Sequence, residues 1–158
     1  MRKYISIPNV PASLVSEVKP YVINKIPNSE KPSVGSSAES AKIFRSIYDV
    51  NDIDLKEYFF IMCLNQASKV NAVVKIGEGS INSCVADVAE ILRAAIMTNS
   101  RFIICCHNHP SGQLKASDSD KAITKRVRDA ADLMGLKLLD HIILTSESYY
   151  SLADNGDF

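Results

Sequence analysis

From residue 36 onward, the sequence alternates between segments with helical periodicity and short runs that are almost wholly apolar. Runs such as 57–65 (EYFFIMCLN) and 101–106 (RFIICC) leave no polar face for solvent, which is typical of strands that are buried on both sides. Helices that alternate with buried strands cover both faces of one sheet. The sequence therefore predicts an α/β fold in which helices flank a central sheet.

The sheet is expected to be mixed. Residues 57–65 and 69–77 are separated only by a short polar turn, so they are expected to pair as an antiparallel hairpin. The later strands are separated from one another by loops and helices. Those strands are expected at 101–106, 136–145 and within 148–154, and the helices at 36–50, at 85–100 and from about Ser117 to a stop at Gly135.

Each expected helix has one apolar stripe that predicts its buried face. The first helix begins with a capping-box pattern, Ser36 and Glu39. The residues expected to face the core are Ile43 and Ile47 in the first helix, Val85, Val88, Ala89, Leu92, Ala95 and Ile96 in the second, and Ile123, Val127, Ala130 and Met134 in the third.

The first 35 residues differ from the rest because they hold five of the six prolines and more positive than negative charge. Proline at this density excludes long helices and central strands. Residues 1–35 are therefore expected to form an extended arm with short strands near 4–7 (YISI) and 21–24 (YVIN). Such an arm could pack on the body of the domain or pair with the sheet edge of a second copy in a homodimer.

The composition argues against several classes of function and of binding site. The net charge is zero and the basic residues do not cluster, which argues against a large nucleic-acid footprint. No apolar run reaches the length of a membrane span and the first residues do not resemble a signal peptide, so a cytoplasmic protein without a membrane partner is expected. The four cysteines form no Cys-x-x-Cys pair, which excludes a cysteine-only zinc site.

The stretch CCHNHPSG (105–112) places two of the three histidines at the end of a predicted strand. His107 and His109 are two residues apart, so they can point the same way, and neutral imidazole is a common metal ligand. Asp120 would complete a set of three ligands, which leaves a fourth position on zinc open. Asp120 and Ser117 also fit a plain helix capping box, and Asp118 is an alternative ligand.

The segment HNHPSGQLKASDSD (107–120) has the pattern His-x-His-Pro, then Ser-x-x-Asp, and it resembles the JAMM motif of JAB/MPN metalloproteins. Together with DHIIL (140–144), it is similar to the RadC branch of that superfamily, from about residue 37 to the C-terminus. The resemblance implies a RadC-like JAB/MPN domain at 36–158, a cytidine deaminase-like three-layer sandwich, and one Zn²⁺ per chain.

The resemblance also implies a role for each matching residue. His107, His109 and Asp120 match the zinc ligands of the family. Ser117 matches a serine that stabilises the developing oxyanion or the metal water. Glu57 falls where the family has a glutamate that serves as general base, although a lone carboxylate at a strand edge is usually only a solvated charge.

Other polar residues compete for these roles or support them. Glu78 and Glu90 are alternative carboxylates, but their contexts are those of ordinary loop and helix charges. Asp140 and His141 interrupt an apolar strand, which indicates either a satisfied buried pair or support for the ligand histidines from behind.

The motifs lead to two hypotheses for the function. The first is a JAMM-type zinc hydrolase that cleaves a peptide or isopeptide amide in an unknown protein or peptide substrate. The alternative is a RadC-like accessory factor of DNA repair without proteolytic activity. The arm does not match the helix-hairpin-helix DNA-binding module of full-length RadC proteins, and VADVAEI (85–91) replaces their Pro-Arg-Glu sequence.

Two further hypotheses for the function have less support in the sequence. A metal-free scaffold would be expected to have lost a ligand, and the Pro-Cys-x-x-Cys signature of zinc deaminases does not occur.

Overall fold

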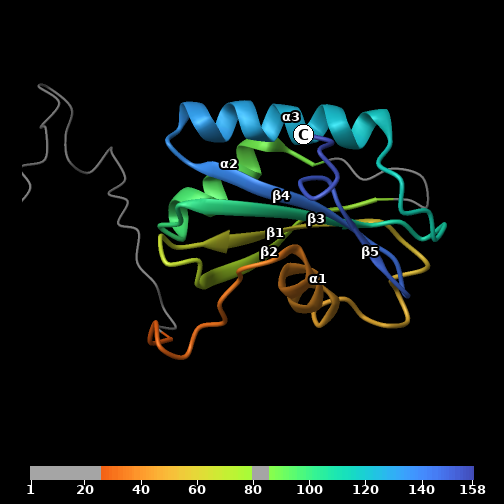
Figure 1. Cartoon of the computed structure of the whole chain (residues 1–158), viewed down its shortest axis with the longest axis horizontal. Coiled ribbons are helices and arrows are strands. Elements are labelled where there is room, and N and C mark those ends of the chain that lie inside the picture. The colour runs from red at the N-terminus through yellow and green to blue at the C-terminus, as the bar shows by residue number, and fades with distance from the viewer. Residues whose placement is uncertain (1–25, 80–85) are drawn as a thin grey trace, which may run out of the picture.

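The structure is a computed structural model that describes residues 26–79 and 86–158. A five-stranded mixed sheet forms the centre of the fold (Figure 1). The short strands expected near 4–7 and 21–24 lie outside the described residues, as do Cys84 and Val85. The elements are α1 (Ser37–Arg45), β1 (Tyr58–Leu64), β2 (Val70–Glu78), α2 (Val88–Met97), β3 (Phe102–Asn108), α3 (Asp118–Leu133), β4 (Lys137–Leu144) and β5 (Tyr149–Ser151).

The strand order is β2-β1-β3-β4-β5, and only the central pair β3 and β4 is parallel. Helix α3 connects these two parallel strands and lies with α2 on one face of the sheet, while α1 lies on the other (Figure 1). The predicted α/β class, the antiparallel hairpin of β1 and β2, and the three layers are therefore confirmed.

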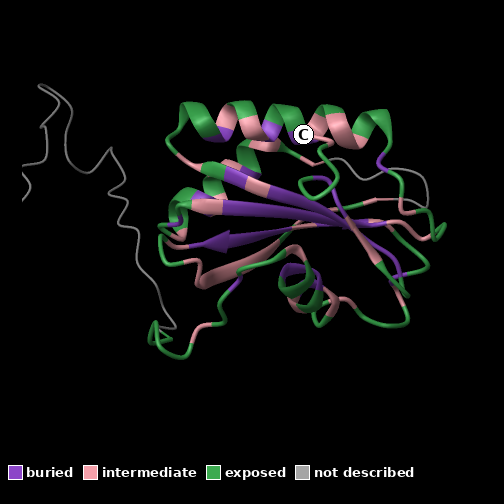
Figure 2. Ribbon diagram, viewed as in Figure 1, coloured by how far each residue is buried: buried purple, intermediate pink, exposed green. Residues whose placement is uncertain are grey.

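The two faces of the sheet carry two separate apolar clusters. The strands β1, β3 and β4 between them are mostly buried, whereas the edge strand β2 is only partly buried (Figure 2). Because side chains alternate along a strand, Ile103 and Cys105 of β3 face α2 and α3, while Ile104 and Cys106 face α1. These cysteines are buried free thiols. The next residues of β3, His107 and Asn108, continue the two rows with polar side chains.

The predicted core face of α1 is wrong in one position. The helix ends at Arg45, whose guanidinium donates hydrogen bonds to three carbonyls of the β4–β5 turn, so Ile47 lies beyond the helix and is 42% exposed. Ala41 and Phe44 face the sheet instead, and Ile43 is half-buried. The periodicity misplaced Ile47 because it was extended past the true helix end, whereas Ile43 packs against the apolar cluster under α1 as predicted.

The predicted core faces of α2 and α3 are confirmed in part, because Ala95 and Val127 belong to the apolar cluster and Val88, Leu92 and Ile123 pack against it. Helix α2 begins at Val88, because the side chain of Asp87 caps it by accepting from the Ala89 amide. Its buried residues are Ile91 and Ala95, while Ala89 and Ile96 are exposed. In α3 the buried residues are Thr124, Val127 and Ala131, and Met134 is the exposed C-cap before Gly135, whose φ of 71° ends the helix as predicted.

The last residues of the predicted arm pack on the domain. The Val34 amide donates to the Ser68 carbonyl, the Val70 amide donates to the Pro32 carbonyl, and Val34 joins the apolar cluster under α1. This short pairing extends the sheet next to the start of β2. Within the described residues, no helix has both the length and the apolar character needed to cross a membrane.

Replacement of Phe44 with Ala tests the corrected face of α1. Phe44 is fully buried, so Phe44→Ala is expected to lower the free energy of unfolding by about 3–5 kcal/mol. Ile47→Ala is the matched control and is expected to change it by less than about 0.5 kcal/mol. Urea titration measures both, and an equal loss in the two variants would contradict the assignment.

Candidate metal centre

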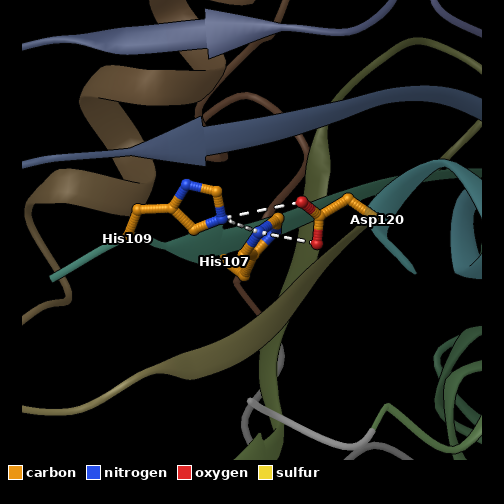
Figure 3. Close-up of side chains that lie close together, drawn as sticks. All are labelled: His107, His109 and Asp120. Carbon is orange, nitrogen blue, oxygen red and sulfur yellow. Dashed lines mark hydrogen bonds and ion pairs between the residues drawn. The ribbon is translucent and has the colours of Figure 1, made fainter. Parts of the chain in front are cut away.

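His107 and His109 leave the end of β3 on the side of the sheet that carries α2 and α3. His107 is the second-to-last residue of the strand and is 1% exposed, while His109 follows the strand and is half-buried. Their side chains and that of Asp120, from the first turn of α3, point toward one another (Figure 3). The cluster therefore joins the sheet to the N-terminal end of a helix.

A tight turn after β3 orients His109. The Gly112 amide donates to the His109 carbonyl over 3.0 Å, and Gly112 has a φ of 77°, which glycine adopts without strain. The chain then brings the Gln113 carbonyl oxygen 2.7 Å from His109 Nδ1. Because a carbonyl only accepts, Nδ1 carries the proton, and Nε2 presents a lone pair to the cluster when the ring is neutral.

Asp120 is both a capping residue and a member of the cluster. Its Oδ2 accepts from the backbone amide and the hydroxyl of Ser117, each over 2.7 Å, and its own amide donates to the Ser117 hydroxyl. Its Oδ1 lies 3.2 Å from His107 Nε2, and Oδ2 lies 3.6 Å from His109 Nε2. The capping box thus holds the carboxylate toward the two imidazoles.

The spacing of the donor atoms fits a small divalent cation. The two Nε2 atoms are 2.9 Å apart, and all three ligand atoms lie within 4.8 Å of one another. Tetrahedral zinc with bonds of about 2.0–2.1 Å separates its ligand atoms by roughly 3.3 Å. His107, His109 and Asp120 could therefore hold a metal ion, and they are the one such group among the described residues. Asp118, the alternative ligand, is exposed and outside it.

The charges of the cluster shift its pKa values in opposite directions. Burial acts to raise the pKa of Asp120, but the close contacts with the imidazoles of His107 and His109 outweigh it and hold that pKa well below its usual range. The hydrogen bond with Asp120 raises the pKa of His109, although burial opposes the shift. The carboxylate is therefore ionised at any physiological pH, and its charge favours the protonated form of His109 in the metal-free protein.

Glu57 lies just before β1, half-buried and close enough to the cluster to interact with its charges. Burial raises the pKa of Glu57, while His107 and His109 lower it and Asp120 raises it further. The competing carboxylates lie elsewhere. Glu78 is exposed and pairs with Lys56 and Lys75, and Glu90 is exposed on α2.

Asn108 fixes the segment that carries Glu57. It continues the row of β3 side chains on the α1 face and is fully buried. Its Oδ1 accepts from the Tyr58 amide over 2.7 Å, and its Nδ2 donates to the carbonyls of Ile53 and Lys56 over 2.6 and 2.7 Å. The backbone is thus bonded to Asn108 on both sides of Glu57.

The two polar residues of β4 have different neighbours. The Nε2 atom of His141 is 2.9 Å from His107 Nδ1, behind the cluster, and burial lowers the pKa of His141 well below its usual value. Asp140 points away from the imidazoles. Its carboxylate accepts from the Ser151 hydroxyl and from the amides of His141 and Ala153, so it ties β4 to β5 and the turn after it.

Sequence reasoning missed two residues of this region. Asn108 could have been found, because a polar residue between two candidate ligands at the end of an apolar strand requires buried partners. Thr124 touches His141 from α3, but a threonine on a helix carries no such signal.

Removal of the Asn108 amide is expected to destabilise the fold. Asn108→Ala leaves two carbonyls and one amide without their partner, which is expected to lower the free energy of unfolding by about 3 kcal/mol. Asn51→Ala is the control, because Asn51 is exposed and its side chain bonds to the neighbouring Asp49. Denaturant titration of both compares them, and a loss below about 1 kcal/mol for Asn108→Ala would contradict the assigned role.

The comparisons with known proteins agree on one protein family. The profile of the RadC-like JAB domain matches residues 34–157. The chain is 34% identical to a UPF0758 protein of Porphyromonas gingivalis over 133 residues, which cover 84% of this chain and 59% of that protein. It is 37% identical to a UPF0758 protein of Flavobacterium johnsoniae over 102 residues (65% and 44%), and 43% identical to one of Alkaliphilus metalliredigens over 101 residues (64% and 44%). The chain spans about half the length of these relatives.

Proposed function

Because the chain belongs to the RadC-like JAB domain family, we propose that it is a zinc-dependent hydrolase of the JAMM type that cleaves a peptide or isopeptide amide. The observation that supports this proposal is the convergence of His107, His109 and Asp120 on one point, beside a half-buried Glu57. Two imidazoles and one carboxylate are the ligand set of catalytic rather than structural zinc.

One Zn²⁺ per chain, held by His107, His109 and Asp120, would supply a Lewis acid that polarises a carbonyl and lowers the pKa of water. The protein supplies the orientation. His109 is fixed by the Gln113 carbonyl, Asp120 by Ser117, and His107 by stacking on Phe59 with ring centroids 6.1 Å apart. Because the site lies at the end of a strand and the start of a helix, its side chains need to move little when substrate binds.

Glu57 is the proposed general base. Its raised pKa makes it a better proton acceptor than an exposed glutamate while it is ionised. It would take a proton from the attacking water and pass it to the leaving amine. Asn108 contributes by holding the backbone on both sides of Glu57, so the carboxylate stays beside the ligands.

Ser117 is the proposed donor to the oxyanion. Its hydroxyl hydrogen is directed at Asp120 Oδ2 over 2.7 Å, and its oxygen accepts from the Asp120 amide. Rotation of the hydroxyl would release this hydrogen to a developing negative charge on the substrate, while the backbone amide of Ser117 keeps its own bond to Asp120.

Glu57→Gln tests the proposed base. The variant is expected to bind zinc with wild-type stoichiometry and to lose about 10²–10⁴-fold in kcat, because the amide cannot take the proton. Turnover is measured on a pool of internally quenched peptides, half of them branched at a lysine Nε. Glu78→Gln is the control and should keep full activity. Equal activity of Glu57→Gln and wild type, or no cleavage of any peptide by the zinc-loaded wild type, would count against the proposal.

The raised pKa of His109 predicts how zinc affinity depends on pH. A ligand imidazole must be neutral, so zinc competes with the proton on His109, and that proton is lost only above the raised pKa. The apparent affinity is therefore expected to fall about tenfold per pH unit on acidification, with the fall beginning above the ordinary value of 6.5. Competition with a zinc-sensitive dye between pH 8.5 and 5.5 measures it. A constant affinity down to pH 6 would contradict this prediction.

A further inference from the structure

We propose that Thr124 and His141 form a buried relay that fixes the tautomer of His107, so that His107 Nε2 always presents a lone pair to the metal. The inference rests on the proposed metal site but concerns residues that do not touch the metal. Thr124 and His141 are positioning residues, and Thr124 is the one that determines the direction of the relay.

The relay is a continuous chain of close contacts from the ligand to helix α3. His107 Nδ1 is 2.9 Å from His141 Nε2, and His141 Nδ1 is 2.6 Å from the Thr124 hydroxyl. That hydroxyl also contacts the backbone carbonyl of Asp120, one helical turn earlier. His107, His141 and Thr124 are each no more than 1% exposed, so water does not substitute for any of these contacts.

The position of each proton follows from the last contact of the chain. The Asp120 carbonyl can only accept, so it takes the one hydrogen of the Thr124 hydroxyl. The Thr124 oxygen must then accept from His141, which places the His141 proton on Nδ1. His141 Nε2 is left with a lone pair, so His107 must donate to it from Nδ1. His107 Nε2 is therefore unprotonated and faces His109 and Asp120.

The opposite direction would disable the site. If the Thr124 hydroxyl donated to His141, then His141 would donate to His107, and the His107 proton would sit on Nε2, where the metal belongs. A doubly protonated His141 is also unfavourable, because the ring is fully buried and no carboxylate is hydrogen-bonded to it among the described residues. Of the two directions, only the first satisfies the Asp120 carbonyl and leaves His107 Nε2 free for a metal.

The relay also links two ligands to one another. It connects His107 on β3 to the first turn of α3, which carries Asp120, by way of His141 on β4. Phe59 from β1 packs against both rings, with centroids 6.1 Å from His107 and 5.4 Å from His141. A disturbance at Thr124 is therefore expected to reach the ligand set without any change in the ligands.

Three variants of untagged protein test the proposal. Thr124→Val keeps the shape and removes the hydroxyl, so zinc affinity is expected to fall about 10–100-fold. Thr124→Ser restores the hydroxyl and is expected to recover most of that loss. Val127→Ala, a buried change one turn away on the same helix, controls for lost stability and is expected to bind zinc like the wild type. Affinity is measured by competition with a chelator.

The tautomers are read directly by long-range ¹H–¹⁵N correlation of the imidazoles in the metal-free protein at pH 8. All three histidines of the chain belong to this region, so the spectrum contains no other rings. The proposal predicts that His107 and His141 are protonated on Nδ1 in the wild type and in Thr124→Ser, and that this pattern is lost in Thr124→Val.

Two results would overturn the relay: protonation of His141 on Nε2 in the wild type, or equal zinc affinities for Thr124→Val and Val127→Ala. The first readout needs neither zinc nor turnover, so a chain that cleaves no amide could still show the tautomer pattern. Failure of the relay and failure of the proposed hydrolase are therefore separate outcomes.

Discussion

The alternation of side chains at the end of β3 is the constraint on which the rest of the site depends. Successive side chains of a strand point to opposite faces of the sheet, so the last two residues of this buried strand face opposite sides. Here His107 points toward α2 and α3, where it meets the other two candidate ligands, and Asn108 points toward α1, where it holds the backbone around Glu57. The dipeptide thus supplies one of the candidate metal ligands and holds the backbone that carries the proposed base.

This arrangement requires several polar groups in the interior, and they are stable there because each has partners. Among the described residues, no buried side-chain nitrogen or oxygen lacks a hydrogen bond. His141 contacts His107 and Thr124, and Asp140 accepts three hydrogen bonds on the far side of β4. A network satisfied in this way restricts each ring to one orientation, which is what a metal site with little freedom to rearrange requires.

The sequence predicts the local parts of this structure and misses those that depend on contacts across the fold. The pattern of apolar residues located all five strands to within a few residues. The spacing of His107 and His109, with the family resemblance that favoured Asp120 over Asp118, predicted the three residues that the structure brings together. Glu57 was assigned only through the resemblance to a family, because nothing near it in sequence links it to residues 50 positions away. Ile47, Ile96 and Met134 were assigned to the core because apolar periodicity continues past the residues at which helices end or lose contact with the sheet.

The most direct test of the account is zinc X-ray absorption on untagged protein that has been purified without added metal. The account predicts about one zinc per chain, with two histidine nitrogens and the remaining ligands oxygen, at about 2.0–2.2 Å. It also predicts that Asp120→Asn, which keeps the side-chain shape, lowers the affinity of the site for zinc. The absence of zinc even after loading with one equivalent, or a sulfur ligand at about 2.3 Å, would contradict a centre built from His107, His109 and Asp120.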